Sequence, residues 1–581
     1  MCGIIGYIGR REAAPLIVEG LKKLEYRGYD SFGVATLGTD ISLAKHQGRI
    51  SEKAGTAARL KGKIGIGHTR WATHGIPNDS NAHPHTDCSG KIAVVHNGII
   101  ENYADLKRHL LSRGHIFRSD TDTEVIVHLV EEEYAKKTDL LIAVQAVIPK
   151  LEGSYAILVI VAGEDRIIAA RNASPLVIGI GDGEFFAASD MTPVIEFTER
   201  AIYLEDGDTV SLTKKKIEIF HNGKPVTRPV ELIDWSLADV RKGGFAHFML
   251  KEIYEQPQAF YTTIRSVDPA SLPEEVLHAK SITLVACGSS YHTGLIFKYL
   301  LEAICGIPAR LEFASEFKYF PPPVTGLVIG ITQSGETADT LAAIRHAKTS
   351  GCSTLAITNV LGSSITRVAD ITLFMRAGPE ISVAATKSFI AQLAILMQIV
   401  NSISDRKYDD VLQQAHKAIE EVLLMDLSEA VTVCKKAQSV FYVGRGPFYP
   451  VSLEGALKMK EISYIHAEGY SAGELKHGPF ALLSSETPVI ALCMPGDTYN
   501  VMISNIKEMK ARGAPVIAIG IEGDGELPDI VDIFIAVPKT PIFVQILTSL
   551  VIEQLLAYHT AVALGRDVDK PRNLAKSVTV E

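Results

Sequence analysis

The second residue of the chain is a candidate nucleophile. Cys2 follows Met1 directly, and removal of Met1 would place the Cys2 thiol beside a free α-amino group. Such an amine has a pKa of about 7.7–8.0, so it can accept the thiol proton near neutral pH, as in other N-terminal nucleophiles. A free cysteine is also commonly a small buried apolar residue. Position alone leaves both interpretations open.

Six short motifs favour the nucleophile. They are MCGIIGYIG at the N-terminus, LEYRGYDSFG (24–33), GHTRWATHG (67–75), NAHPH (81–85), HNGIIEN (96–102) and DTDTE (120–124). In this order they resemble the class II glutamine amidotransferase domain. The resemblance implies an α+β N-terminal-nucleophile (αββα) glutaminase over residues 2–215, in which Cys2 attacks the carboxamide of glutamine.

The same resemblance implies roles for the residues around Cys2. The Asn97 side chain and the Gly98 N–H would bind the developing oxyanion. The Arg70 guanidinium would pair with the α-carboxylate of glutamine, and Asp122 would hold its α-ammonium group. Without the resemblance, a surface ion pair would be the simpler interpretation of Arg70 and Asp122. The other expected pocket residues are Trp71, at the gate to an ammonia channel, Thr73 and His74.

The histidines of this half do not predict a metal site. His83 and His85 flank a proline, and His68, His74 and His96 lie nearby in the sequence. No carboxylate or cysteine completes a ligand set at a recognisable spacing. We therefore expect structural or pocket histidines, and no metal.

A cluster of polar residues follows the apolar strand predicted at 327–331. Thr332, Gln333, Ser334 and Thr337 surround a glycine and precede a predicted helix. Hydroxyls, an amide and backbone N–H groups at a helix N-terminus form an anion site that suits a phosphate monoester. One such residue would indicate ordinary helix capping. Four of them at the carboxyl end of a strand favour phosphate.

A second polar set lies further along the chain. Glu454, Lys458 and Glu461 are four and three residues apart, so a helix places them on one face. A solvated, salt-bridged face is the simpler interpretation. However, apolar residues and a His- and Gly-rich loop follow directly, which is unusual beside a solvent-exposed stripe. A carboxylate and amines converging on a phosphosugar could move a proton between adjacent carbons.

From about residue 275 the predicted strands and helices alternate, and the pattern repeats. The matching pairs are ITLVACGSS (282–290) with SVFYVGRGP (439–447), LVIGITQSGET (327–337) with VIALCMPGDT (489–498), IRHAKTSGCSTLAI (344–357) with IKEMKARGAPVIAI (506–519), and ADITLF (369–374) with VDIFIA (531–536). Matching elements in one order predict two copies of a doubly wound α/β domain. We assign them to 273–408 and 434–570, after a linker at 216–272 and before a non-helical tail at 571–581.

This half resembles a pair of sugar isomerase (SIS) domains. The whole chain, including KEIYEQP (251–257) and the terminal PRNLAKSVTVE, resembles the isomerising glutamine–fructose-6-phosphate aminotransferases. That resemblance implies glutamine and fructose 6-phosphate as substrates and glucosamine 6-phosphate and glutamate as products. It also implies the first step of hexosamine (UDP-N-acetylglucosamine) synthesis, without any cofactor.

The family resemblance also implies the residues of the sugar half-reaction. His477 would help to open the sugar ring, and Lys576 would form a Schiff base with the ketose carbonyl. Glu461 would transfer the proton between C1 and C2, and Lys458 would steady the enolamine. Burial and the cationic Lys458 could depress the pKa of Lys576. The expected sugar-phosphate contacts are Ser290, Thr332, Gln333, Ser334, Thr337, Val383 and Ala385.

Two positions depart from the family pattern. Thr332 stands where serine is expected, which keeps the hydroxyl. Ala385 stands where family members often have serine. A backbone contact from Ala385 to the sugar would be unaffected, whereas a hydroxyl contact would be lost.

Two other functions stay open on the sequence alone. One is amination of a different keto-sugar phosphate, because a phosphate loop does not read sugar stereochemistry. The other is non-catalytic sensing of a sugar phosphate. A sensor predicts the loss of Cys2, Glu461 or Lys576, and all three are present.

Composition limits the remaining classes of protein. The chain has 581 residues, 47% of them hydrophobic, and a net charge of −9, which indicates about three or four soluble domains and argues against broad nucleic-acid binding. Its seven cysteines are scattered without a CxxC motif, as in reduced cytosolic proteins, and the N-terminus does not resemble a signal peptide. We expect a cytoplasmic homodimer with no membrane or nucleic-acid partner.

One segment is long enough to cross a bilayer. Residues 543–564 are mostly apolar, but Gln545, Glu553, Gln554 and His559 interrupt the run. A glutamate at mid-bilayer is costly. We therefore expect a buried core or subunit-interface helix.

Overall fold

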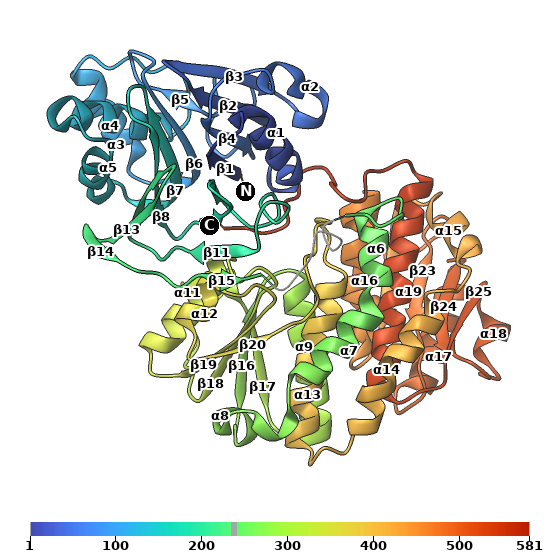
Figure 1. The fold of residues 1–581 in the computed structure, drawn as a ribbon. Coiled ribbons are helices and arrows are strands. Elements are labelled where there is room, and N and C mark those ends of the chain that lie inside the picture. The colour runs from blue at the N-terminus through green and yellow to red at the C-terminus, as the bar shows by residue number, and fades with distance from the viewer. Residues whose placement is uncertain (1, 234–240, 580–581) are drawn as a thin grey trace.

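The N-terminal part of the chain is a sandwich of two antiparallel sheets. The computed structural model describes residues 2–233 and 241–579, and Figure 1 shows the sandwich in blue to green. One sheet has the order β15-β11-β9-β10-β1-β4-β2-β3 and the other β14-β13-β12-β8-β7-β6-β5. In the first sheet the strands are β1 (Gly3–Ile8), β2 (Ser31–Leu37), β3 (Ile41–Gln47), β4 (Ile64–Arg70), β9 (Val177–Ile180), β10 (Phe185–Ala188), β11 (Arg200–Tyr203) and β15 (Glu231–Leu232). In the second they are β5 (His85–Thr86), β6 (Ile92–Ile100), β7 (Gly153–Val161), β8 (Arg166–Asn172), β12 (Asp208–Thr213), β13 (Ile217–His221) and β14 (Lys224–Val226).

Alternating side chains place one apolar core between the sheets and one on each outer face. Ile4 and Ile66 of the first sheet share the central core with Leu158 of the second. The outer faces are covered by α1 (Ala13–Lys23) and α2 (Ile50–Ala57) on one side, and by α3 (Tyr103–Ser112), α4 (Glu124–Lys137) and α5 (Leu140–Val147) on the other. This arrangement of helix, sheet, sheet and helix confirms the predicted αββα class.

The C-terminal part contains two parallel sheets of the same topology. Their orders are β17-β16-β18-β19-β20 and β22-β21-β23-β24-β25, so each strand of one has a counterpart in the other. The first set is β16 (Ile282–Ala286), β17 (Ala309–Phe313), β18 (Leu327–Ile331), β19 (Ser353–Thr358) and β20 (Ile371–Phe374). The second is β21 (Ser439–Gly444), β22 (His466–Ser471), β23 (Val489–Leu492), β24 (Val516–Ile521) and β25 (Ile533–Val537). The predicted repeat of a doubly wound domain is therefore confirmed.

Helices cover both sheets and join them through a shared core. The longer ones are α9 (Ser289–Cys305), α11 (Ala338–Thr349) and α13 (Lys387–Ile403) in the first repeat, α14 (Asp409–Val422) and α15 (Ser428–Cys434) between the repeats, and α16 (Phe448–Ser463), α17 (Tyr499–Lys510) and α19 (Ile542–Ala563) in the second. The short ones are α8 (Glu274–Leu277), α10 (Ala314–Phe317), α12 (Ser364–Val368) and α18 (Leu527–Ile530). One apolar core runs through residues of both repeats, including Phe297, Leu396 and Leu550.

The segment predicted as a linker, 216–272, has regular structure in its described residues. Strands β13 to β15 extend the edges of the N-terminal sheets. Helices α6 (Phe248–Tyr254) and α7 (Gln256–Ser266) pack in the core of the C-terminal half. The prediction of a linker was therefore wrong: β13 to β15 are short strands at or next to sheet edges with little apolar periodicity, and α6 and α7 are short helices.

The apolar helix α19 lies inside the C-terminal half. It is long and apolar enough to cross a membrane, yet 89% of its most apolar window is buried within the chain. It packs against α14 and α16 (Figure 1). Its Glu553 is 1% exposed, and burial, with Glu454 nearby, raises the pKa of Glu553 well above its ordinary range. A neutral carboxyl in a core helix explains how Glu553 is accommodated there.

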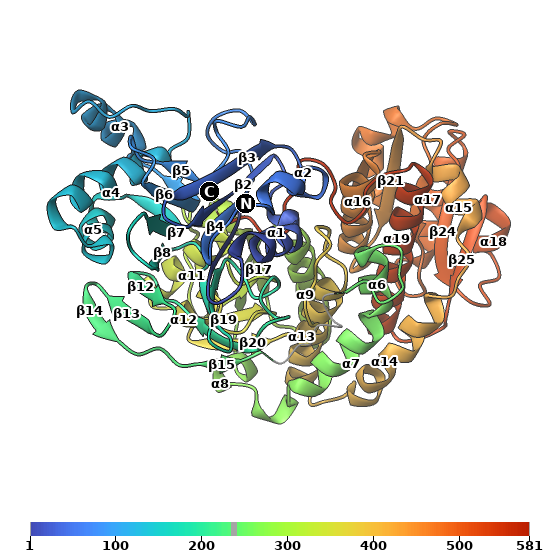
Figure 2. The same ribbon diagram turned by 45° about the horizontal axis from the view of Figure 1, so that its top comes forward.

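Beyond α19 the described residues, 564–579, contain no further helix, as predicted for 571–581. We call residues 564–579 the tail; it leaves the second repeat and passes the N-terminal domain (Figures 1 and 2). The Lys570 ammonium pairs with the buried Glu25 carboxylate at 2.5 Å. The backbone carbonyl of Val578 accepts a hydrogen bond from the Ala338 N–H at 3.1 Å. The tail therefore contacts both the N-terminal sandwich and the first C-terminal repeat.

Candidate active site

Cys2 lies at the start of β1, facing the loop that follows β4. The Trp71 N–H donates to the Cys2 sulfur at 3.3 Å. The Asn97 amide donates to the Cys2 carbonyl oxygen at 2.9 Å, so these sequence-predicted residues meet. Burial raises the pKa of the Cys2 thiol. The thiol therefore needs a nearby base to become a nucleophile at neutral pH.

The predicted oxyanion donors occupy adjacent positions on β6. Asn97 is buried, and Gly98 follows it with φ +130°. A Cβ at Gly98 would lie 2.0 Å from the Ser154 carbonyl oxygen of β7. Only glycine fits this close approach of two strands.

The predicted glutamine-binding pair is buried beside Cys2. Arg70 ends β4, and its Nη2 donates to the carbonyls of His74 and Gly75. Its Nη1 is buried and forms no hydrogen bond among the described residues. Asp122 accepts a hydrogen bond from the Ile100 N–H at 2.8 Å. A buried, unpaired guanidinium nitrogen is a suitable donor for a substrate carboxylate.

The loop after Arg70 carries the remaining predicted pocket residues. Trp71 packs edge-on against Tyr29, with ring centroids 5.7 Å apart. His74 makes a similar contact with Tyr103 at 5.1 Å. Thr73 is exposed. The aromatic contacts fix Trp71 and His74, whereas Thr73 faces solvent.

The predicted phosphate loop follows β18, beside β16, where the strand order of the sheet reverses. The Thr332 and Thr337 hydroxyls are 2.8 Å apart, and the Gly335 N–H donates to Thr332 Oγ1 at 3.3 Å. The Ser334 hydroxyl accepts from the Glu336 N–H at 3.2 Å. Ligands of doubly wound folds bind at such a switch point. The hydroxyls thus line one turn at the N-terminus of α11, as expected.

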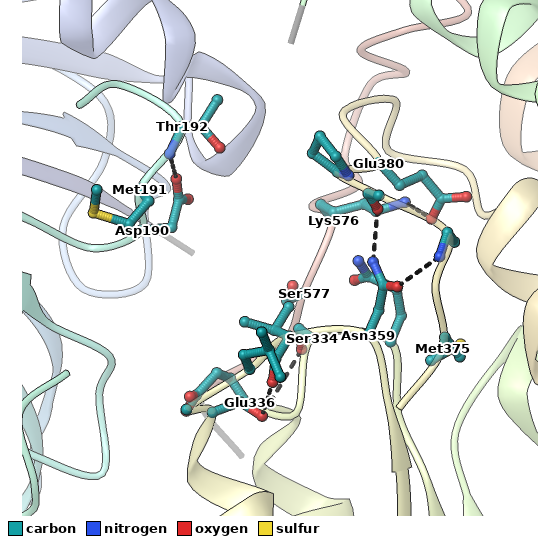
Figure 3. A pocket seen from close by; sticks show the side chains of 18 of the residues that line it. Asp190, Met191, Thr192, Ser334, Glu336, Asn359, Met375, Glu380, Lys576 and Ser577 are labelled. Carbon is teal, nitrogen blue, oxygen red and sulfur yellow. Dashed lines mark hydrogen bonds and ion pairs between the residues drawn. The ribbon is translucent and has the colours of Figure 1, made fainter. Parts of the chain in front are cut away.

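Lys576 and part of this loop share a cavity between the N-terminal domain and the first C-terminal repeat. The cavity has a volume of about 460 Å³ and is lined by Lys576, Gln333, Ser334 and Asn359 among others. Figure 3 shows Lys576 pointing to Glu380 on one wall, with Asp190 and Thr192 of the N-terminal domain across the space. This brings the predicted Schiff-base lysine to the side of the predicted phosphate loop.

The charge environment of Lys576 differs from the expected one. Its ammonium pairs with Glu380, and the two side chains are 4% and 0% exposed. Burial alone would raise the pKa of Glu380, but the Lys576 ammonium and the hydrogen bonds from Ser388 together outweigh burial and lower that pKa to about 2. The expected cationic neighbour, Lys458, instead pairs with carboxylates of α16. Glu380 is a site residue that sequence reasoning missed, because no local motif marks it.

The polar face of α16 is buried rather than solvated. Glu454 and Lys458 are each 1% exposed. The Lys458 ammonium lies 2.6 Å from Glu461 Oε2 and 3.4 Å from Glu454 Oε1. Burial would lower the pKa of Lys458, but Glu461 and Glu454 outweigh it and raise that pKa. Lys458 therefore stays cationic beside Glu461.

Helix α9 of the first repeat completes the α16 cluster. The Ser289 hydroxyl donates to Glu454 at 2.8 Å, and Lys458 donates to the Ser289 oxygen at 3.2 Å. His292 Nδ1 lies 2.7 Å from the other Glu454 oxygen. Sequence reasoning missed Ser289 and His292, although Ser289 adjoins the predicted Ser290 in the same Gly/Ser turn.

The other predicted sugar-site residues are more dispersed. The Ser290 hydroxyl accepts from the Gln392 amide at 3.0 Å. The Val383 N–H donates to the tail carbonyl of Asp569 at 3.1 Å, and Ala385 is half-buried two residues on. His477 ends a short 3-10 helix and is exposed. Among the hydrogen bonds and ion pairs of the described residues, none joins His477 to Lys576 or Glu461.

Comparison with known proteins agrees with this domain organisation. The SIS domain profile matches residues 275–402 and 434–564, and the glutamine amidotransferase domain profile matches residues 68–196. The chain is 49% identical to the glutamine–fructose-6-phosphate aminotransferase (isomerising) of Thermococcus kodakarensis, with 100% of both chains covered. It is 45% identical to the protein of that name from Bacteroides thetaiotaomicron, again over 100% of both.

Solved structures also resemble this chain. The C-terminal domain of glucosamine-fructose-6-phosphate aminotransferase from Francisella tularensis is 34% identical, with a TM-score of 0.52. It covers 57% of this chain, and 99% of that domain is matched.

Proposed function

The chain belongs to the family of isomerising glutamine–fructose-6-phosphate aminotransferases, and we propose which residues carry out each half-reaction. The enzyme transfers the amide nitrogen of glutamine to fructose 6-phosphate, forming glucosamine 6-phosphate and glutamate. We assign amide cleavage to the Cys2 pocket and amination with isomerisation to the SIS pair. The observation that carries this division is the tail, which contacts the N-terminal domain through Lys570 and carries Lys576 beside the phosphate loop.

The glutaminase half-reaction begins at Cys2 after removal of Met1. The freed α-amino group takes the thiol proton, and the sulfur attacks the glutamine carboxamide. Asn97 and the Gly98 N–H stabilise the oxyanion, which collapses with loss of ammonia to a thioester that water hydrolyses to glutamate. The unpaired Arg70 nitrogen holds the α-carboxylate, and Asp122 holds the α-ammonium group.

The sugar half-reaction uses the tail and α16. Thr332, Ser334 and Thr337 hold the phosphate at the end of β18. Lys576 leaves Glu380 and condenses with the C2 carbonyl, releasing water. Glu461 moves a proton between C1 and C2, and the buried cation of Lys458 steadies the developing negative charge.

Ammonia from the Cys2 site enters before this proton transfer. It adds to the C2 imine and displaces the Lys576 amine, which frees the lysine and leaves an unsubstituted imine at C2. The proton shift from C1 to C2 by Glu461 then gives the 2-amino aldehyde, glucosamine 6-phosphate. Trp71 lies between Cys2 and Tyr29. Its backbone N–H donates to the Cys2 sulfur, and its ring packs against the Tyr29 ring. The Tyr29 hydroxyl in turn accepts a hydrogen bond from the Asn573 N–H of the tail at 2.8 Å. This placement supports Trp71 as the gate between the two sites.

We also propose a cytoplasmic homodimer. All seven cysteines are free, as expected for a reducing compartment. His477, expected to open the sugar ring, is exposed and makes no described contact with Lys576. We therefore propose that a second copy of the chain supplies this histidine to the sugar site. Light scattering on the eluted protein should give twice the 63.0 kDa chain mass; a mass of one chain would contradict the dimer.

The overall activity is tested in one tube. Protein that has lost Met1 is incubated with fructose 6-phosphate and glutamine, and glutamate and hexosamine phosphate are both quantified. Equal molar amounts support the proposed coupling. Formation of glutamate without amino sugar would contradict fructose 6-phosphate as the acceptor. If neither glutamate nor hexosamine phosphate formed, the Cys2 assignment would be contradicted.

A further inference from the structure

Four metal-binding side chains converge in the N-terminal domain, in a set distinct from the predicted active-site residues. They are Cys88, in the turn between β5 and β6; His115, in the segment between α3 and α4; and His128 and Glu131, one turn apart on α4 (Figure 1). We call them the Cys88 cluster. One potential ligand atom from each lies within 4.8 Å of every other.

The separations of these atoms match a tetrahedral zinc site. The Cys88 sulfur lies 3.6 Å from His115 Nδ1 and 3.7 Å from His128 Nδ1. Glu131 Oε2 lies 3.0 Å from each of the same two nitrogens. Zn²⁺ bonds of about 2.3 Å to sulfur and about 2.0–2.2 Å to nitrogen or oxygen, at tetrahedral angles, separate the ligand atoms by about 3.3–3.6 Å. Small movements would bring all four atoms onto one ion.

Both histidines have a carboxylate at the opposite ring nitrogen. His115 Nε2 lies 3.3 Å from Glu132 Oε1, and Arg113 holds Glu132 at 2.6 Å. His128 Nε2 lies 3.7 Å from Glu124 Oε1. Zinc-bound histidines usually donate their second N–H to such a group, which fixes the tautomer that leaves the other nitrogen free for the metal.

A hydrogen-bonded polar cluster without metal is the alternative, and one observation argues against it. Both Nδ1 atoms and the Cys88 N–H converge on Glu131 Oε2, so without a metal this one oxygen would have to accept three hydrogen bonds. One cation would satisfy the thiolate, both nitrogens and this oxygen together.

We propose that the Cys88 cluster binds one Zn²⁺ as a closed structural site. The donor set of one sulfur, two imidazoles and one carboxylate suits Zn²⁺ better than Mg²⁺ or Ca²⁺, which prefer oxygen. Four protein ligands leave no open position, which indicates a structural role. Cys88 is half-buried and Glu131 is 23% exposed, so an ion can enter from solvent.

The bound ion would hold the segment that carries Asp122. That segment runs from His115 into α4 and is tied down at Ser119, whose hydroxyl donates to Glu124 at 2.7 Å, and at Thr121, whose hydroxyl contacts His85 Nε2 at 3.0 Å. Zinc would add a link from His115 and α4 to the β5–β6 turn. Loss of the ion should therefore weaken glutamine binding and leave the SIS half intact.

The test measures zinc directly on the full-length chain. Protein stripped with a chelator and then dialysed against Zn²⁺ should retain about one ion per chain, measured by elemental mass spectrometry. Cys88→Ser and His128→Gln should each lower zinc affinity by more than about tenfold. Cys305→Ser, another half-buried thiol located at the end of α9, is the matched control and should retain the ion.

A second readout keeps the proposal falsifiable if a variant folds poorly. The unsubstituted protein loaded with Co²⁺ should show a thiolate-to-metal charge-transfer band in the near ultraviolet, and Zn²⁺ should displace it. Retention of less than about 0.2 zinc per chain, absence of that band, or unchanged zinc affinity in folded Cys88→Ser would each overturn the site.

Discussion

At the scale of single residues, the proposed nucleophile Cys2 should determine whether glutamine is used. Its thiol lies within 3.3 Å of the Trp71 N–H and beside Asn97, whereas Lys576 and Glu461 belong to the SIS half. Cys2→Ala should lower glutamine-dependent synthesis by more than about 10³-fold. Synthesis from added ammonia should continue, because the sugar site is untouched. Glutamate and hexosamine phosphate measured with either nitrogen donor check this, and full glutamine-dependent turnover in the variant would disprove the nucleophile.

Glu461 is the corresponding residue of the sugar half. Glu461→Gln keeps the size of the side chain but removes the carboxylate that we propose as the base for proton transfer between C1 and C2. Synthesis should fall by about 10²–10⁴-fold with either nitrogen donor, while glutamine hydrolysis continues. Lys460→Ala, on the exposed side of the same helix, is the control and should keep its activity. Equal loss in the two variants would indicate damage to α16 rather than loss of a base.

At the scale of elements, one buried carboxyl on α6 makes the stability of the fold depend on pH. Glu252 of α6 accepts hydrogen bonds from the Ile381 and Ser382 N–H groups. Burial is the largest cause, and with the Glu380 carboxylate it raises the pKa of Glu252 from 4.5 to about 7. The Lys576 and Lys387 ammonium groups lower this pKa, but by less. The folded state therefore binds this proton more tightly than the unfolded state. The resulting stabilisation is present below about pH 4.5 and is lost as the pH rises to about 7.

Glu252→Gln should remove this dependence, because glutamine resembles the protonated carboxyl. Between about pH 5 and about pH 7.5 the unsubstituted protein should lose on the order of 1–3 kcal/mol of stability more than the variant. Calorimetric Tm values of both proteins at the two pH values measure the difference. Glu274→Gln, at an 81% exposed side chain, should behave like the unsubstituted protein. A parallel decline in Glu252→Gln would assign the effect to other groups.

Helices and strands could be predicted from the sequence, whereas contacts between distant segments could not. Matching segments in one order predicted both parallel sheets, because strand ends and glycine turns leave local signals. The αββα sandwich was expected from the family resemblance of the motifs around Cys2. The pairing of Lys576 with Glu380, 196 residues away, left no such signal. The Cys88 cluster was missed for the same reason: its ligands come from three segments without a regular spacing, and the sequence predicted no metal.

At the scale of the whole molecule, the tail connects two domains whose reactions must be coupled. Its Lys570 pairs with Glu25 of the sandwich, and the Val578 carbonyl accepts a hydrogen bond at the start of α11. Lys576 lies between these anchors. Because the segment between Lys570 and Lys576 is short, we expect movement of the tail at the N-terminal domain to displace Lys576.

Tyr29 is the contact at which this coupling can be weakened without altering either site. Its hydroxyl accepts from the Asn573 N–H at 2.8 Å and donates to the Pro571 carbonyl at 3.3 Å, while its ring still packs on Trp71 in Tyr29→Phe. Losing two hydrogen bonds of about 0.5–1.5 kcal/mol each should loosen the tail. Glutamine hydrolysis should persist, and the ratio of hexosamine phosphate to glutamate should fall below one, by up to roughly tenfold. Tyr261→Phe, which removes a hydroxyl from α7, should keep the ratio at one. If Tyr29→Phe also keeps that ratio, the tail does not transmit the state of one site to the other through this contact.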